Sequence, residues 1–365
     1  MFKRFKNAIN NDERIGSIDI FRALAIISVM LSHYNDFVPG FYKFGGLGVD
    51  LFFVISGFLV SSYLIQEFDT KNKISYSGFI LRRAFKILPS YYFFLIVGYI
   101  FAIIFIMPIR AEQVPLITEL PQYFLFYRNY GGPPERMTFD HAWSLCVEEH
   151  FYITLPLLFI ICLTYFSGKK KWLFIIVLSA IIFTYCFKIF SWITLIAEYP
   201  TYSHNRVDAL SLGVLLALLI YYFKDRLKGF TKNPFLFISA FSVLMAMLFF
   251  HEYFEEGFFN IVLHHTVGPI CFFVMLLSLY DYKFRLLTPL KFIAYYSYNL
   301  YLWHFLIVIP VNFYLGNTFA GFFTYIIISF VLAIFFTWLI EEKFLALRDR
   351  FLQRKSLAVQ PDQII

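Results

Sequence analysis

Long apolar runs alternate with short polar or basic stretches along almost the whole chain. An α-helix needs about 20 apolar residues to cross the hydrocarbon core of a bilayer, and ten runs are of that order of length. They fall at about 18–38, 46–66, 88–107, 145–165, 172–190, 206–223, 235–252, 261–280, 292–312 and 319–340. We therefore predict an all-α fold, a polytopic bundle of about ten transmembrane helices. A single domain is expected over 1–345, with a short cytoplasmic tail at 346–365.

The basic residues predict how this bundle is oriented. Most of the 31 lysine and arginine residues lie before the first run, in every second loop and after the last run. Because such residues favour the cytoplasmic side, both termini are predicted to be cytoplasmic. With 60% hydrophobic and 15% charged residues, the composition excludes an ordinary soluble protein. The net charge of +7 follows from the asymmetry and predicts contact with membrane lipid, with no nucleic acid as a partner. We expect an integral, multi-pass protein of the plasma (inner) membrane.

Two ionisable residues interrupt the first apolar run. Arg22 and His33 are eleven positions apart in IDIFRALAIISVMLSHYNDF. Eleven steps of about 100° make almost three turns, so both side chains are predicted on one helix face, roughly 16 Å apart. Ionisable side chains at membrane depth are costly and mark functional sites by default. The pair predicts a path from the inner toward the outer side of the membrane.

Asp50 is predicted to lie near His33. His33 ends the first run on the outer side, and Asp50, in GGLGVDLFFVISGFL, begins the second run there. A tight antiparallel hairpin would bring both to one level, and a carboxylate that orients a histidine is a common arrangement for a general base. The alternative is that His33 caps a helix near the interface. Residue type alone leaves both interpretations open.

The outer end of the fourth run, HAWSLCVEEHFYITLP, gathers five polar or aromatic side chains: Trp143, Ser144, Glu148, Glu149 and His150. Adjacent carboxylates point in different directions on a helix, so at most one Glu is expected to face a given cavity. Arg206 and Asp208 begin the sixth run in NRVDALSLG, from where they could pair with such a carboxylate across the bundle. Ordinary interface residues are the alternative for both groups.

Basic residues gather at the inner end of the third run, where Arg82, Arg83 and Lys86 precede Leu88 and Pro89. Arg83 and Lys86, at i and i+3, can share a face. A helix that begins near Pro89 would also direct free backbone N–H groups toward an anion. A phosphate-rich ligand would suit this site. The cytoplasmic preference of basic residues explains the same charges without a ligand.

The cysteines and the remaining histidines do not predict a metal site. All four cysteines fall at or within apolar runs, without the paired spacing of a disulfide framework or a zinc site: Cys146, Cys162, Cys186 and Cys271. They are expected to be small packing residues. His264, His265 and His304 do not form a convergent set of three or four ligands in the sequence, so we expect no metal.

Six segments that contain these residues occur in order along nearly the whole chain: Arg22 with His33, GVDLFFVISGFL at 48–59, RRAFKILP at 82–89, WSLCVEEHFY at 143–152, RVDALSLG at 206–213 and YSYNLYLWH at 296–304. Together they resemble the acyltransferase-3 family of integral membrane acyltransferases. The resemblance implies a membrane-bound O-acyltransferase. Its donor substrate would be cytoplasmic acyl-CoA, often acetyl-CoA, and no cofactor would be bound permanently. Its acceptor would be a hydroxyl of an envelope glycan or another outward-facing carbohydrate or glycolipid.

The resemblance also implies roles for individual residues. Arg22 and His33 match the basic residue and the histidine that the family needs for activity, and Arg83 with Lys86 matches a cytoplasmic pair linked to the donor. The second member of that pair is usually Arg, and Lys86 keeps the charge but lacks the planar fork that grips phosphate. The residues at 342–344 also depart from the family, where a proline often follows.

These observations combine into one hypothesis. The coenzyme's phosphates would lie near Arg83 and Lys86, and its pantetheine arm would run past Arg22 until the thioester reaches His33. His33 would act as general base, with Asp50 or one Glu of the 148–149 pair holding the imidazole or the acceptor. A covalent acyl-histidine intermediate is an alternative that the sequence does not distinguish.

Two other classes of protein compete with this interpretation. A non-catalytic transporter that exports a glycan or lipid-linked intermediate could use the same intramembrane charges as ligands, although neither inverted repeats nor paired broken helices are visible. A structural membrane subunit is the other class, but it would have to explain why Arg22 and His33 lie on one helix face when neither takes part in a reaction. Some family members carry an extra hydrolase-like domain outside the membrane. None is expected in this chain, so the bundle would acylate the acceptor directly or a separate extracytoplasmic partner chain would complete the transfer.

Overall fold

The structure is a computed structural model that describes residues 16–34, 42–132, 136, 138–166, 169–194, 200–250, 253, 258–282 and 288–358. Within these residues, eight helices are long and apolar enough to cross a membrane, and two shorter apolar helices accompany them. Each of the ten predicted runs overlaps one of these helices, which confirms the all-α polytopic fold, and the ends of two runs, at 35–38 and 251–252, lie outside the described residues. The basic residues before the first run, which were predicted to be cytoplasmic, fall within 1–15 and lie outside the described residues.

The longer helices have these bounds: α2 Gly16–His33, α3 Tyr42–Lys71, α4 Tyr76–Phe101, α7 Trp143–Tyr165, α8 Lys169–Thr194, α9 Val207–Phe223, α10 Pro234–Phe249, α11 His264–Ser278, α12 Thr288–Leu315, α13 Phe319–Phe336 and α14 Glu342–Ala358. π-helical turns join several of them: Ala102–Ile106 after α4, Phe258–Leu263 before α11 and Thr337–Glu341 before α14. The connection between α4 and α7 contains the short helices α5 Met107–Arg110 and α6 Leu120–Phe124, with 3-10 turns at Ala111–Gln113, Ile117–Glu119, Arg128–Tyr130 and Asp140–Ala142. Two further 3-10 turns flank α9, at Ser203–Asn205 and Lys224–Leu227.

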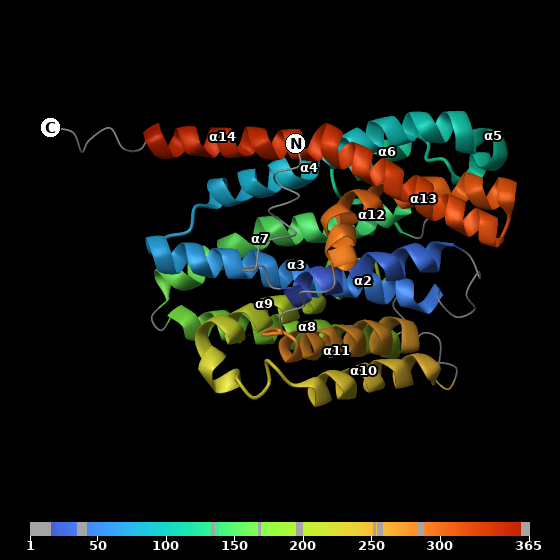
Figure 1. The fold of residues 1–365 in the computed structure, drawn as a ribbon. Coiled ribbons are helices and arrows are strands. Elements are labelled where there is room, and N and C mark those ends of the chain that lie inside the picture. Colours follow the sequence, from blue (N-terminus) through green and yellow to red (C-terminus); the bar gives the residue numbers. More distant parts are fainter. Residues whose placement is uncertain are drawn as a thin grey trace.

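The helices run side by side in three layers (Figure 1). One outer layer contains α4, α5, α6, α13 and α14, the middle contains α2, α3, α7 and α12, and the other outer layer contains α8 to α11. The turn between α3 and α4, the end of α7 and the C-terminal part of α14 lie at the left end of Figure 1, which we call the basic end. The end of α2, at His33, and the beginning of α7 lie toward the opposite end. The middle layer therefore connects the two ends through the protein interior.

Two glycines bring α3 and α9 into backbone contact. A Cβ atom added to Gly57 would lie 2.0 Å from the carbonyl oxygen of Leu210, and one added to Gly213 would lie 2.1 Å from that of Val54. Small residues allow such close approach between membrane helices, where packing rather than the hydrophobic effect drives association. The segments SGF and SLG therefore fix how α3, which carries several candidate residues, sits in the bundle.

Helix α4 begins earlier than the sequence predicts. It starts at Tyr76, where the Ser75 side chain accepts a hydrogen bond from the backbone N–H of Gly78, and Pro89 lies inside the helix. The expected helix start near Pro89, with its free N–H groups, is therefore wrong. Membrane helices tolerate internal proline, and the basic segment before it extends the helix toward the basic end. Any anion near Arg83 must be bound by side chains.

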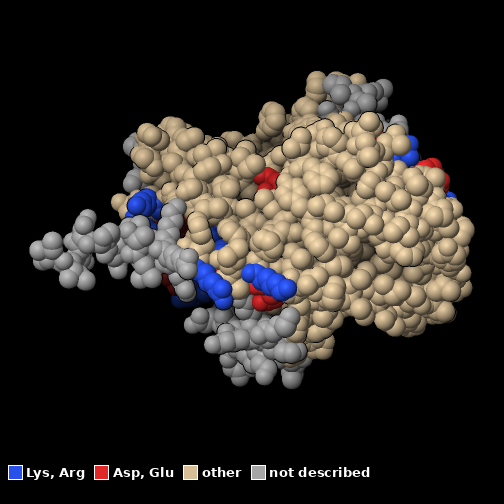
Figure 2. All heavy atoms as spheres, turned by 90° about the horizontal axis from the view of Figure 1, so that it is seen from above, with Lys and Arg blue, Asp and Glu red and all other residues tan. Residues whose placement is uncertain are grey.

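Charged side chains are sparse on the face seen in Figure 2. Most of its lysine and arginine side chains lie toward the basic end, with a few charged side chains near the opposite end. The cysteines are free, and three are buried, Cys186 being the exposed one. Residues 346–358 continue the chain as part of α14, and the rest of the predicted tail lies outside the described residues.

Candidate active site

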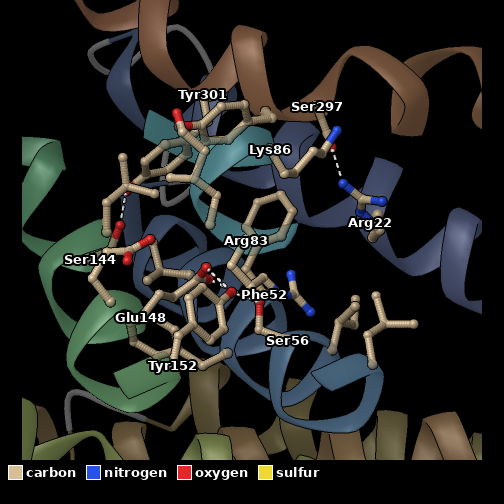
Figure 3. Close-up of a pocket in the computed structure, with 18 of the residues that line it drawn as sticks. Arg22, Phe52, Ser56, Arg83, Lys86, Ser144, Glu148, Tyr152, Ser297 and Tyr301 are labelled. Atoms are coloured by element: carbon tan, nitrogen blue, oxygen red, sulfur yellow. Dashed lines mark hydrogen bonds between the residues drawn. The ribbon is translucent and has the colours of Figure 1, made fainter. Parts of the chain in front are cut away.

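A cavity of about 360 Å³ lies among α2, α3, α4, α7, α12 and α14. Its polar lining includes Arg22, Ser56, Arg83, Lys86, Ser144, Glu148, Glu149, Tyr152, Ser297, Tyr298, Tyr301 and Arg348. Figure 3 shows Arg22 and Lys86 on one side, with Glu148, Tyr152 and Ser56 on the other. The volume is at the lower end of small-molecule pockets, about 300–1,000 Å³. The cavity therefore has room for a slender part of a large ligand.

Cationic side chains enter the cavity from its basic end. The Arg22 guanidinium donates to the Ser297 hydroxyl at 3.1 Å, which ties α2 to α12. The Lys86 ammonium is paired with the Glu341 carboxylate. The Arg83 guanidinium lies over the Tyr152 ring at 4.8 Å and has no hydrogen-bond partner among the described residues. Its five N–H donors are therefore available to a ligand.

Arg82 does not belong to this group. Its guanidinium lies over the Tyr63 ring at 5.6 Å, outside the cavity, and its buried Nε has no partner among the described residues. Arg83 and Lys86 share the cavity, as their i and i+3 spacing predicts. Of the three basic residues expected near a phosphate-rich ligand, the structure brings two together.

Both acidic residues of α7 line the cavity, so the expectation that at most one would do so is wrong. The Glu148 carboxylate accepts hydrogen bonds from the Tyr152 hydroxyl at 2.5 Å and the Ser56 hydroxyl at 3.0 Å. Glu149 has no hydrogen-bond partner among the described residues. The cavity covers more than 100° of the helix surface, which is why neighbouring side chains both reach it.

A pair of hydroxyl groups closes the end of the cavity away from the basic end. Ser144 Oγ and the Tyr301 hydroxyl lie 2.6 Å apart, and both contact the carbonyl oxygen of His141, at 3.2 and 2.8 Å. Both hydroxyl protons are used within this set, because one hydroxyl group donates to the His141 carbonyl oxygen and the other donates to the first hydroxyl group. Ser144 is thus at the cavity as predicted, and Tyr301 is its partner.

His33 lies beyond this closure and is not in the cavity lining. Its Nδ1 lies 3.0 Å from Nε2 of His304 on α12, one turn past Tyr301. Arg22 also contacts α12, so the prediction that Arg22 and His33 share a helix face is confirmed. The cavity that Arg22 lines reaches Ser144 and Tyr301 but does not include His33.

The predicted contact between Asp50 and His33 is wrong. One Asp50 oxygen accepts from Arg206 Nη1 at 2.6 Å and the other lies 2.8 Å from His265 Nδ1. Asp50 is fully buried, and the Arg206 guanidinium also lies over the Trp143 ring at 5.2 Å. These residues form a buried cluster that does not line the cavity, because α3 turns Asp50 toward α9 and α11.

Arg206 and Asp208 do not pair with the carboxylates of α7 either. Asp208 accepts a hydrogen bond from Lys188 at 2.6 Å, and both are buried. Sequence reasoning could not select these partners because their residue types are common and their separations, 156 residues for Asp50 with Arg206 and 20 for Asp208 with Lys188, do not single them out. Each acidic group is thus paired with a cation from another part of the bundle.

Asp50, His264 and His265 do converge, which the sequence did not predict. One ligand atom of each lies within 4.8 Å of the others, and all three are buried. The Arg206 guanidinium already contacts the Asp50 carboxylate and lies 3.3 Å from His265 Nε2. A second cation would be repelled at that distance. The donor set fits an ion-pair cluster better than a metal site.

Sequence reasoning did not assign the α12 side chains that complete the site. Ser297, Tyr301 and His304 are spaced i, i+4 and i+7, so they lie on one helix face. They contact Arg22, Ser144 and His33, respectively. A polar stripe of this spacing within YSYNLYLWH was the available signal.

Comparison with known proteins identifies the class of this bundle. A family described as an acyltransferase domain, the acyltransferase-3 family, matches residues 15–342. The chain belongs to this family of membrane acyltransferases, which confirms the resemblance seen in its motifs.

The chain is similar to O-acetyltransferase OatA of Staphylococcus aureus strain NCTC 8325 / PS 47, with 30% identity over 338 residues that cover 86% of this chain and 53% of OatA. OatA of the strains COL and MRSA252 matches with the same identity and coverage. The chain spans about half the length of the curated relatives it matches. No solved structure matches it.

Proposed function

We propose that this protein transfers an acyl group, acetyl in the first instance, from cytoplasmic acyl-CoA to a hydroxyl of an outward-facing envelope carbohydrate. Family membership supports acyl transfer, and the name of the similar O-acetyltransferase OatA supports acetyl and an oxygen acceptor. The single observation that carries the proposal is the cavity that extends from Arg83, which has no hydrogen-bond partner among the described residues, to the Ser144–Tyr301 pair.

The donor would enter with its phosphates at the basic end. Arg83 has free donors for phosphate oxygens, and Lys86 can exchange Glu341 for phosphate. The narrow cavity suits the pantetheine arm, whose amide N–H groups would find an acceptor in Glu149. Arg22, held by Ser297, would lie along the arm. Phosphates that stay at the cytoplasmic surface avoid the cost of burying charge in the membrane.

The reaction would take place at His33. The Nε2 lone pair would take the proton from the acceptor hydroxyl as its oxygen attacks the thioester carbon. An O–C bond forms, the C–S bond breaks, and the proton passes from His33 to the departing thiolate, so CoA leaves as the thiol. The hydroxyl pair of Ser144 and Tyr301 would separate to admit the thioester from the cavity.

The proposal is tested in inside-out membrane vesicles that contain the protein and the cell's own acceptors. Acetyl-CoA labelled in the acetyl group is added outside the vesicles, and label in the carbohydrate fraction is counted. A general base contributes about 10²–10⁴ in rate, so His33→Gln should lower incorporation by at least about 100-fold at equal protein content. His204→Gln, the same substitution at a histidine in the connection before α9, is the matched control and should label normally.

Two outcomes would contradict the proposal. Wild-type vesicles that label no more than vesicles without the protein would remove the enzymatic function. Movement of carbohydrate across the membrane without label would instead indicate a transporter.

A further inference from the structure

We propose that His304 is the positioning residue that fixes His33 in the tautomer needed for a base. This inference rests on the proposed function, because it concerns how His33 would act. The inference is drawn from the hydrogen bonds that the His33 and His304 rings make with each other and with the backbone. His304 is fully buried on α12, and the His33 ring packs edge-on against Phe305 at 4.7 Å.

The first step concerns the proton on His304. Its Nδ1 lies 2.8 Å from the carbonyl oxygen of Tyr301 and 3.0 Å from that of Leu300. Carbonyl oxygens accept and never donate, so Nδ1 of His304 must carry a proton. In a neutral imidazole the other nitrogen is then an acceptor. His304 Nε2 therefore presents a lone pair to His33.

The second step passes this constraint to His33. Its Nδ1 lies 3.0 Å from that lone pair, so Nδ1 must be the donor. The neutral His33 ring then has its own lone pair on Nε2. The backbone of α12 thereby sets the tautomer of a residue on α2 through one intervening imidazole.

This arrangement matches the chemistry required of a base. In a Ser-His-Asp triad, the buried acid holds the histidine in the correct tautomer and stabilises the imidazolium that forms. His304 would do both here without a charge, because its acceptor nitrogen receives the Nδ1–H of His33 before and after the proton transfer. A carboxylate near His33 is then unnecessary, which fits the use of Asp50 elsewhere.

The experiment compares His304→Leu and His304→Gln in the vesicle assay described above. Leucine has a similar size but lacks the acceptor nitrogen Nε2. The side-chain oxygen of Gln can accept a hydrogen bond in place of Nε2. Maximal rate and the KM for acetyl-CoA are measured for each variant at equal protein content. Wild type and His33→Gln are included, so that the proposed function is tested in the same experiment.

We expect His304→Leu to lower the maximal rate by about 10–100-fold, a part of the general-base contribution, with an unchanged KM for acetyl-CoA. His304→Gln should recover activity to within about threefold of wild type, since it restores the acceptor. A merely structural role would give equal losses in both variants.

Three results would overturn the inference while leaving the proposed function intact: a normal rate in His304→Leu, equal losses in both variants, or a loss confined to the KM for acetyl-CoA. Failure of wild type itself to label would remove the proposed function instead. The two failures are thus distinguishable.

Discussion

Replacing Asp50 with Asn separates a structural role for this carboxylate from a catalytic one. Asn keeps the shape and removes the charge, so the buried Arg206 guanidinium at 2.6 Å loses its counter-ion. Neither side chain of the pair is more than 3% exposed, so water cannot compensate the remaining charge. Breaking a buried ion pair from one side costs about 3–5 kcal/mol.

A double-mutant cycle gives the size of the interaction itself. Arg206→Met should cost a similar amount, because it leaves the Asp50 carboxylate buried and unpaired. The double variant has neither charge, so its cost should fall at least about 2 kcal/mol below the sum of the single costs. Reversible unfolding in mixed micelles, with increasing SDS, measures all four proteins.

Activity completes the test. If Asp50 only holds α3, α9 and α11 together, folded Asp50→Asn should transfer acetyl groups within about tenfold of wild type at low temperature. A catalytic partner of His33 would instead give losses of about 10²–10⁴. Normal stability with abolished transfer in Asp50→Asn would refute the structural assignment.

Two further predictions concern the donor and the helix packing. Arg83→Ala should raise the KM for acetyl-CoA about tenfold or more, since a charge-assisted hydrogen bond contributes about 1.5–3 kcal/mol, whereas Arg82→Ala should leave it within twofold because that side chain lies outside the cavity. Equal effects of the two changes in vesicle kinetics would contradict this assignment. Gly57→Ala should destabilise the protein by about 1–3 kcal/mol or more in the same unfolding assay, because its Cβ would meet a carbonyl oxygen at 2.0 Å. Gly229→Ala, with open space around its Cβ, is the matched control, and the packing argument fails if both variants are equally stable.

The apolar pattern was sufficient to predict the fold because the bilayer imposes it. Among the described residues, length and hydropathy identified the eight helices that could span a membrane and the two shorter apolar ones, and helical periodicity placed Arg22 and His33 on one face. The start of α4 was predicted twelve residues late, at 88 instead of 76. The apolar run does not include the basic residues at 82–86, whereas the helical backbone of α4 includes both these residues and Pro89.

The partners of the buried polar residues could not be read from the sequence. Asp50 is close to His33 along the chain, yet it contacts Arg206 and His265, which are 156 and 215 residues away. Which side of α3 faces which neighbour depends on packing contacts such as those of Gly57, and these are invisible before the helices are assembled. For the same reason the contact between His304 and His33 could not be predicted, since the two residues are 271 positions apart and meet only when α2 and α12 pack together.

The closure formed by Ser144 and Tyr301 has a consequence for the energetics of the whole cell. A pore lined by arginines and histidines would conduct protons and ions and would dissipate the voltage across the envelope. In the described part of the chain, both hydroxyl protons are used within the set of two hydroxyl groups and one carbonyl, so neither is free to donate to a string of water molecules. We therefore expect the closed pair to hinder the flow of protons through the bundle, so that vesicles containing the protein hold a proton gradient in the absence of donor.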